Sequence, residues 1–152
     1  MDNLLIQSHN VLRWAVVILG LYAVTKAILG LLKKQEYTPN HNLSATLFLS
    51  SVDLQLLLGL ALYVARGWAS KFSDMAGTMS DSVTRFWAIE HAITMIIAAV
   101  LVHIGRSKSK KATTAAKKHK ISLIFFGIAF LLIMYMIPWS FKPEGIARSL
   151  WP

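Results

Sequence analysis

The sequence of 152 residues contains no cysteine. This absence excludes disulfide bonds, thiolate metal sites, covalent haem attachment through a C-x-x-C-H motif and thiol nucleophiles. Acidic residues are also few, with seven Asp and Glu against 16 Lys and Arg, so the formal net charge is +9. A basic chain binds nucleic acid when its charges lie on one face of a folded soluble domain. Here they lie between long hydrophobic runs, and we expect no nucleic-acid partner.

Hydrophobic residues make up 55% of the chain and charged residues only 15%. The hydrophobic residues are concentrated in four runs, at residues 11–32, 43–64, 86–104 and 121–139. Each run is close to the roughly 20 residues that a helix needs to cross a bilayer. The sequence therefore predicts a single all-α domain: an integral membrane four-helix bundle in the lipid bilayer, with up-down-up-down connections.

The residues between the runs predict the orientation. Segments 33–42 and 105–120 lie on one side and hold nine Lys and Arg against one acid, Glu36. The other side holds five basic and four acidic residues: Arg66, Lys71, Arg85, Lys142 and Arg148, with Asp2, Asp74, Asp81 and Glu144. Since basic loops remain in the cytoplasm, both termini are expected outside it. An outer belt of five tryptophans agrees: Trp14, Trp68, Trp87, Trp139 and Trp151.

Segment 105–120 is rich in lysine and shows no apolar periodicity. It is expected to be a solvated loop that contacts anionic lipid. The fourth run contains no ionisable residue, so any chemistry of the bundle is expected from the first three.

Ionisable side chains inside the runs are candidates for function, because each costs about 2.5 to 3.5 kcal/mol to insert. His9 and Arg13 share one helix face near the outer start of the first run. Glu90 and His91 lie near the outer start of the third. Apolar character begins at Leu4 on the first helix and at Phe86 on the third. His9 and His91 each follow five residues later, which predicts a similar depth for the two histidines. Two imidazoles at one depth can clamp the iron of a flat cofactor, so His9 and His91 are predicted haem ligands.

Two arginines are placed to bind the haem propionates, Arg13 and Arg85, since a guanidinium pairs with a carboxylate in a bidentate fork. Glu90 is expected to orient an imidazole or to take part in proton movement. In the alternative interpretation, His9 is an interfacial histidine and Glu90 forms an ion pair with Arg13 or Arg85.

Asp53 lies in the middle of the second run, with Thr46 and Ser50 on the same helix face. Its carboxyl is expected to be protonated, paired with a cation or bound to metal. A metal site that combines it with His9, Glu90 and His91 ranks third, because Asp53 lies deeper than the histidines.

A further histidine, His103, follows His91 by twelve residues, so a second haem near the inner face would need another imidazole. The only candidates for it, His41 and His119, adjoin lysine-rich segments and are expected to be exposed. One haem is therefore favoured over two.

Four segments resemble a family of short four-helix membrane proteins of Bacteroidetes that are labelled cytochrome b-like: HNVLRW, DLQLLLGLALYV, TRFWAIEHAITM and IGRSKSKKATTAAKKHK. The resemblance covers nearly the whole chain and implies a b-type haem protein of the bacterial inner membrane, with periplasmic termini. One position departs from the family pattern, since this chain has Asp53 where its members tend to have a histidine. A carboxylate is a poor substitute for an imidazole on haem iron.

The leading hypothesis is therefore an electron-carrying subunit with one haem b, which exchanges electrons with a quinol or a redox-partner membrane protein. Stand-alone catalysis is not expected, since no nucleophile with a base appears. The first alternative is a cofactor-free membrane subunit or assembly factor with a buried polar network. The second is a proton-coupled carrier that uses Asp53 and Glu90.

Overall fold

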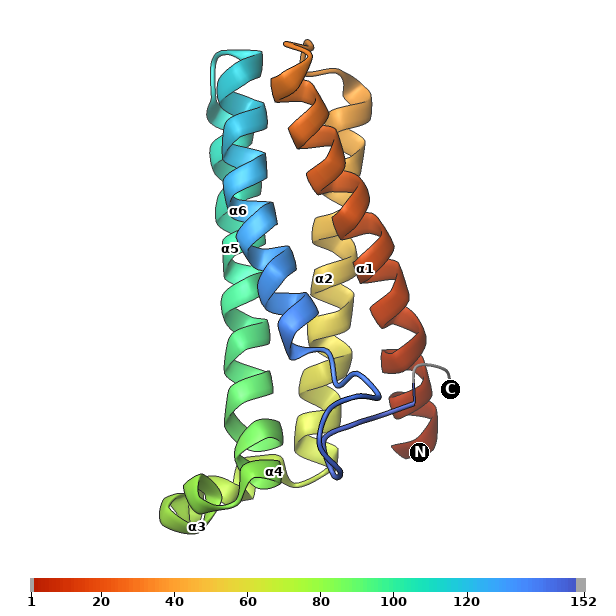
Figure 1. The fold of residues 1–152 in the computed structure, drawn as a ribbon, viewed down its shortest axis with the longest axis vertical. Coiled ribbons are helices and arrows are strands. Elements are labelled where there is room, and N and C mark those ends of the chain that lie inside the picture. The colour runs from red at the N-terminus through yellow and green to blue at the C-terminus, as the bar shows by residue number, and fades with distance from the viewer. Residues whose placement is uncertain (1, 150–152) are drawn as a thin grey trace.

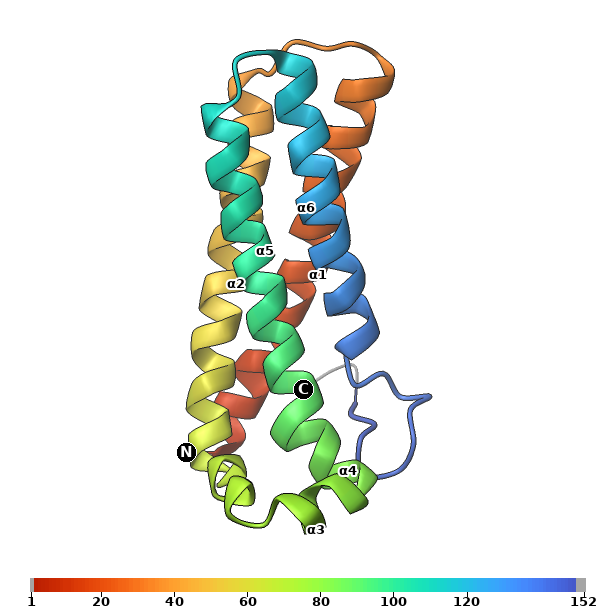
Figure 2. The ribbon, with the colours of Figure 1, turned by 90° about the vertical axis from the view of Figure 1, so that its left-hand side faces the viewer.

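A computed structural model describes residues 2–149, apart from the side chain of Asp2. Within that range the protein is all-helical. Its four long helices are α1 (Asp2–Leu32), α2 (Pro39–Ala65), α5 (His91–Lys111) and α6 (Ala115–Met136). Consecutive long helices run in opposite directions, as Figures 1 and 2 show. The predicted up-down-up-down four-helix bundle is confirmed.

Four shorter elements connect α2 to α5: the 3-10 helix η1 (Trp68–Ser73), α3 (Met75–Ser80), α4 (Ser82–Arg85) and the π-helical turn η2 (Phe86–Glu90). The last two continue directly into α5, so one helix runs from Ser82 to Lys111. The start of α1 lies at the same end of the bundle as α3 and the segment after α6 (Figure 1). We call this the terminal end, and the opposite end, with turns 33–38 and 112–114, the loop end.

The outer surface of the bundle is apolar. Four helices are long and hydrophobic enough to span a membrane. Their outward side chains include exposed residues at every level of the bundle: Ile18, Leu21, Leu57, Val64, Ile97 and Leu131. A helix that is hydrophobic all round is stable only when it is surrounded by protein or lipid. The chain is therefore a multi-pass membrane protein.

The helices extend beyond most of the predicted runs. The first, second and third helices begin before residues 11, 43 and 86, because polar residues at their starts also adopt helical structure. The fourth ends at Met136 instead of Trp139. Pro138 disfavours helical geometry in the residue before it, and Ile137 is extended, with φ −56° and ψ 131°.

The predicted basic loop at residues 105–120 is wrong. Residues 105–111 continue α5, the connection is the turn at residues 112–114, and α6 begins at Ala115. Arg106 is buried between helices, where it donates to Asn42 Oδ1 at 2.7 Å and Thr46 Oγ1 at 2.9 Å. The lysines of this segment lie at the ends of two helices, and those in the last turn of α5, Lys108, Lys110 and Lys111, interact favourably with its C-terminus.

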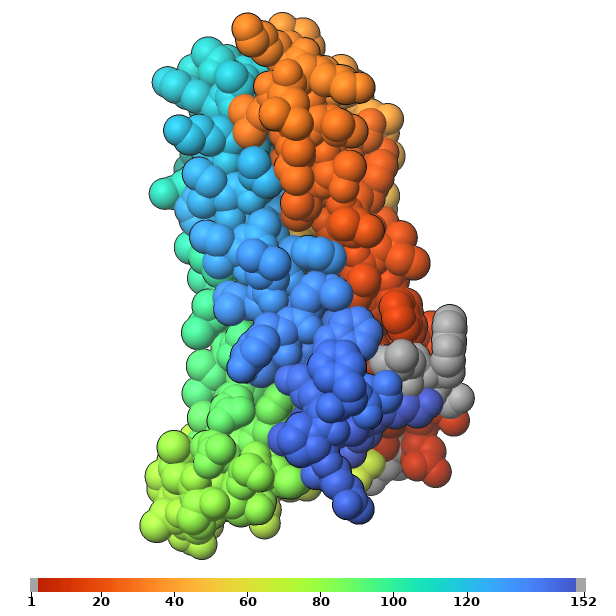
Figure 3. All heavy atoms as spheres, in the orientation of Figure 1, coloured from red at the N-terminus to blue at the C-terminus, as the bar shows by residue number. Residues whose placement is uncertain are grey.

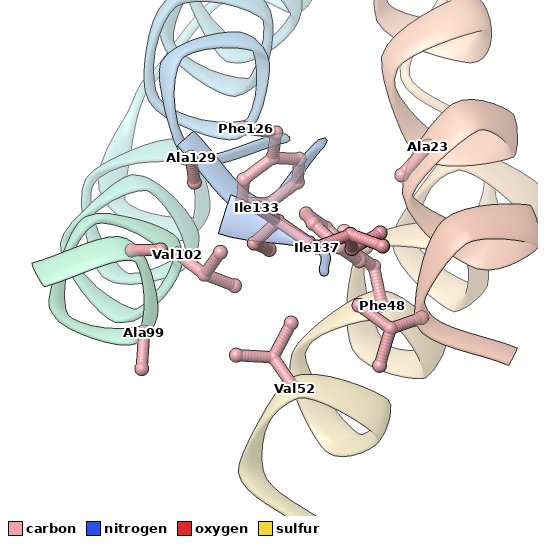
Figure 4. Close-up of a cluster of buried hydrophobic side chains, with 12 residues drawn as sticks. Ala23, Phe48, Val52, Ala99, Val102, Phe126, Ala129, Ile133 and Ile137 are labelled. Carbon is pink, nitrogen blue, oxygen red and sulfur yellow. The ribbon is translucent and has the colours of Figure 1, made fainter. Parts of the chain in front are cut away.

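The core lies midway along the bundle, with contributions from all four long helices (Figure 4). Phe48 of α2 and Phe126 of α6 meet edge to face, with ring centroids 5.6 Å apart. Gly105 allows α5 and α6 to approach closely, since an added Cβ there would lie 2.5 Å from Cβ of Phe125. Small residues are the usual means of close helix packing in membranes. Between the core and the terminal end, the helices enclose a cavity.

Candidate functional site

The cavity has a volume of about 180 Å³ and lies between all four long helices near the terminal end. One water needs roughly 10 to 15 Å³ measured in this way, so the space suits a much larger ligand. Polar side chains reach it from three helices: His9 and Arg13 of α1, Gln55 and Tyr63 of α2, and His91 of α5. Most of the remaining wall is aliphatic or aromatic, as in cofactor sites.

His91 has a defined orientation. Its Nδ1 lies 3.2 Å from the backbone carbonyl oxygen of Met136 at the end of α6. Because a carbonyl only accepts, Nδ1 carries the proton and Nε2 of the neutral ring carries the lone pair. Histidines that bind metals or haem iron are held in the same way, through a second nitrogen that donates to a carbonyl or carboxylate.

The π-helical turn η2 comes directly before His91. It widens the helix by one residue and so changes the direction in which Glu90 and its neighbours face. Within the turn, the carbonyl of Ala88 accepts a hydrogen bond of 2.6 Å from the hydroxyl of Tyr63. Single π turns occur often at functional sites. This one fixes α5 against α2 beside the cavity.

His9 lies against α2. The amide nitrogen of Gln55 is 3.2 Å from Nε2 of His9 and 3.1 Å from its backbone oxygen, so Gln55 donates to both. Nδ1 of His9 and Oε1 of Gln55 are buried without a hydrogen-bond partner in the part of the chain that the structure describes. Gly59 makes room for the ring, since an added Cβ would lie 3.3 Å from Cε1 of His9. His9 and His91 line the same cavity, from α1 and α5.

Three arginines line the cavity, Arg13, Arg66 and Arg148. Arg13 is only 5% exposed, and its Nη2 donates to the carbonyl of Ser149 at 3.5 Å. The guanidinium of Arg148 lies 4.7 Å from the ring centroid of Trp87. Partial burial lowers the pKa of Arg148 below its ordinary value, and the positive charge of Arg66 lowers it further. Three cations make this site favourable for an anionic group.

The segment that follows α6 brings Arg148 to the site. Residues 137–149 pass across the front of the terminal end and reach α1, as Figure 3 shows. The indole nitrogen of Trp87 donates to the carbonyl of Gly145 at 3.0 Å and so holds the segment against η2. Within the segment, the amide of Arg148 donates to the carbonyl of Pro138 at 3.0 Å. Ile137 and Pro138 complete this wall of the cavity.

Glu90 and Arg85 do not line the cavity. They form an ion pair, with Arg85 Nε 2.8 Å from Glu90 Oε1, and both side chains are partly exposed. Arg85 also donates to the carbonyl of Met79 at 2.7 Å. The structure thus shows the ion pair of the alternative interpretation, although the pair is not buried. The predicted roles of these two residues toward a cofactor stay predictions.

Asp53 and His103 meet on the outer face of α2 and α5. Asp53 Oδ1 and His103 Nε2 are 2.7 Å apart, so the carboxyl group of Asp53 pairs with a histidine side chain. Neither residue lines the cavity. No cluster of three or more His, Cys, Asp or Glu side chains suited to a metal ion occurs within residues 2–149.

The expected exposure of His41 and His119 is wrong. Both are buried at the loop end, with ring centroids 4.7 Å apart, and both contact Tyr37. His119 Nε2 donates to the carbonyl of Gln35 at 3.1 Å, and His41 Nδ1 lies 2.8 Å from Thr38 Oγ1. The two candidate partners of His103 are therefore enclosed at the loop end, while the number of haems stays a prediction.

Sequence reasoning missed Gln55, Tyr63, Arg66 and Arg148 at the cavity. Only the polar character of Gln55 inside a hydrophobic run signalled its position. The four tryptophans Trp14, Trp68, Trp87 and Trp139 lie toward the terminal end, where Trp14 contacts Trp139 and Trp68 stacks on Trp87. The fifth, Trp151, lies outside the described residues.

Comparison with known proteins gives no further identification: no family model, curated protein or solved structure matches this chain.

Proposed function

We propose that this protein is an electron-carrying membrane subunit that holds one b-type haem in the cavity between His9 and His91. The observation that carries the proposal is the state of His91, whose Nε2 lone pair is fixed by the hydrogen bond from Nδ1 to Met136. His9 lines the same cavity from α1, so the two imidazoles come from two different helices, as a two-histidine clamp requires. When bound, haem would supply reversible one-electron transfer.

The other residues of the cavity fit such a group. Leu56, Met95 and Ile133 supply an apolar wall suited to a porphyrin face. Arg13 and Arg148 would bind its two propionates, with Arg66 beside them. Bound there, the ring would be shielded from bulk water, and its carboxylates would lie beside the arginines.

His9 needs one rearrangement to act as an axial ligand through Nε2, because the Gln55 amide donates to that nitrogen. Rotation of the Gln55 side chain frees Nε2 and also relieves the unpaired Oε1 of Gln55. Gln55 would then be able to accept or donate toward the bound group.

The type of membrane and the orientation of the bundle in it are part of the same proposal. Basic residues crowd the loop end, at Lys33 and Lys34 and along residues 106–120. By the positive-inside rule this end faces the bacterial cytoplasm, and the terminal end with the cavity faces the periplasm. Electrons would reach the haem from a quinol or from a redox-partner membrane protein. Anionic lipid would contact the lysines of the loop end.

A cofactor-free subunit or assembly factor is the second candidate. It is favoured by the hydrogen bonds from Gln55 to His9 and by the Arg85–Glu90 ion pair, which satisfy part of the polar network without a ligand. Such a network could fix helix packing alone.

An absorption spectrum of the purified protein separates the two candidates. The haem proposal expects a Soret band with sharp α and β bands on reduction, and loss of the band in His91→Ala and His9→Ala. His103→Ala is the matched control, because His103 lies on the outer face away from the cavity. A colourless protein that binds no haem on reconstitution contradicts the proposal and favours the cofactor-free subunit.

A second variant tests the position of His9. An added methyl group in Gly59→Ala would press on the His9 ring at 3.3 Å. We expect a shifted Soret maximum or weaker haem retention in Gly59→Ala, whereas Gly127→Ala, whose Cβ meets only Leu123 Cδ1 at 4.0 Å, leaves the spectrum unchanged. Equal spectra for the two variants would contradict the assignment of His9 as a haem ligand.

A further inference from the structure

A hydrogen-bonded pair of ionisable residues lies on the lipid-facing surface of the bundle at mid-depth. Asp53 of α2 and His103 of α5 are joined at 2.7 Å, yet their side chains are 38% and 54% exposed. Asp53 is 14 residues from the start of α2 at Pro39 and 12 from its end at Ala65. At 1.5 Å per residue it is about 20 Å from either end of the helix, close to the bilayer centre.

Ionisable side chains at this depth almost always face protein or a water-filled cavity, because insertion into hydrocarbon costs about 2.5 to 3.5 kcal/mol each. The Asp53–His103 hydrogen bond offsets only part of that cost. Oδ2 of Asp53 and Nδ1 of His103 make no hydrogen bond within residues 2–149. In a lone bundle, both atoms would face acyl chains.

Other polar residues continue this surface along α2 and α5. Ser50 lies one turn from Asp53 and is exposed, Thr46 follows it toward the loop end, and Ser107 is exposed one turn from His103. We call Thr46, Ser50, Asp53, His103 and Ser107 the α2/α5 polar face. The two helices lie side by side in Figure 2.

The exposed side of α6 differs from this face. Its exposed residues beyond the basic start are Ile124, Ile128, Leu131 and Tyr135, which suit a lipid environment. At mid-depth, α2 and α5 thus present polar side chains where α6 presents apolar ones, and contact with protein would remove these polar groups from lipid.

We propose that the α2/α5 polar face binds the same face of a second copy, in a dimer with a two-fold axis along the membrane normal. Copies inserted in one orientation, related by such an axis, bring residues of equal depth together. Asp53 and His103 share one depth, since they contact each other. The face carries both an acceptor and a donor, so it is complementary to itself.

In this dimer, Nδ1 of each His103 donates to Oδ2 of the other copy's Asp53, and the four side chains form a closed hydrogen-bonded ring. Ser50 and Ser107 let the helices approach closely, because small polar side chains favour contact between helices in membranes. The haem cavity lies inside each bundle and takes no part in the contact.

Cross-linking through single cysteines tests the contact, since the natural chain has no cysteine. Ser50→Cys places a thiol on the polar face, and Leu21→Cys places one on the exposed side of α1. Each site is 11 residues from the loop-end terminus of its helix, so the depths match. After oxidation in native membranes, we expect a band at twice 16.9 kDa for Ser50→Cys and none for Leu21→Cys.

Three results would overturn the dimer: no cross-linked band for Ser50→Cys, equal bands for both variants, or a Ser50→Cys product whose mass requires a different protein. The last of these would assign the face to a heterologous subunit.

The role of the Asp53–His103 pair is tested by measuring the dimer fraction at low protein density in liposomes. The double variant Asp53→Leu with His103→Leu suits lipid and should lower the dimer association constant at least tenfold. The exchanged variant Asp53→His with His103→Asp keeps both groups and should dimerise as the natural protein does. Unchanged dimerisation of the double leucine variant would contradict the proposal. Circular dichroism measures the helical content of each variant and so checks that its bundle is intact.

Discussion

Arg85 Nε and Glu90 Oε1 lie 2.8 Å apart although five residues separate them in the sequence. In an α-helix, five residues correspond to about 140° around the axis, so the two side chains would point in different directions. The π-helical turn at Phe86–Glu90 makes one turn wider and brings them to the same side. The pair is thus a product of local backbone geometry, and it directs the carboxylate of Glu90 away from the cavity.

Removal of this pair should have little effect on the cavity. We expect Arg85→Ala and Glu90→Gln to lower the free energy of unfolding by only about 0 to 1 kcal/mol, the range for partly exposed ion pairs. Lys142 lies close enough to Glu90 for their charges to interact, which limits the loss in Arg85→Ala. Haem content per chain and unfolding in mixed detergent micelles are the measurements.

The comparison variant is Arg13→Gln, which removes a buried cation that lines the cavity. On the haem proposal it lowers haem retention, whereas Arg85→Ala does not. A larger haem loss in Arg85→Ala than in Arg13→Gln would restore Arg85 as the propionate ligand that the sequence suggested.

The sequence predicted the bundle and part of the cavity for a clear physical reason. Hydrophobic runs of membrane length allow few arrangements, and alternating chain direction places the first and third helix starts at one end. Counting residues from those starts put His9 and His91 at one depth, and both line the same cavity. Depth follows from helical rise alone, so it is readable from the sequence.

Lateral contacts were less readable, because they depend on which helix faces which. Arg106 looked like one more cation in a basic segment, but Asn42 and Thr46 of α2 enclose it. His119 looked exposed for the same reason, yet Gly30 of α1 leaves the space that its ring occupies. In both cases the partners lie at least 60 residues away in the chain and have no local signal.

The contact between Gly30 and His119 should be sensitive to a single methyl group. An added Cβ at Gly30 would lie 2.3 Å from Cε1 of His119, a ring that is only 1% exposed and is held by Tyr37 and His41. Since the ring cannot move aside freely, Gly30→Ala should destabilise the bundle by about 1 to 3 kcal/mol, the usual cost of overpacking. Unfolding in mixed micelles measures this.

Two further variants identify the cause. Gly127→Ala meets no atom closer than 4.0 Å and should be neutral or stabilising by up to about 1 kcal/mol. The double variant Gly30→Ala with His119→Ala should cost less than the sum of its single changes, because the clash is gone. Additive costs would show that the two residues do not interact.

Asp81 should make the start of α4 sensitive to acid. Its carboxylate caps the helix, accepting a hydrogen bond from the Thr84 amide at 2.8 Å and another from the Thr84 hydroxyl. These two bonds, the hydroxyl first, lower the pKa of Asp81 from its ordinary value of 3.8. The unfolded chain therefore binds the proton more readily, so the stabilisation is fully present above pH 3.8 and is lost as pH falls through the lower folded-state pKa.

The chemical shift of the Thr84 amide in detergent micelles should report this titration with a midpoint below 3.8. Asp81→Asn keeps an acceptor but cannot ionise, so its Thr84 signal should not titrate with this midpoint. A midpoint at or above 3.8 in the natural protein would mean that the carboxylate does not cap α4 in solution.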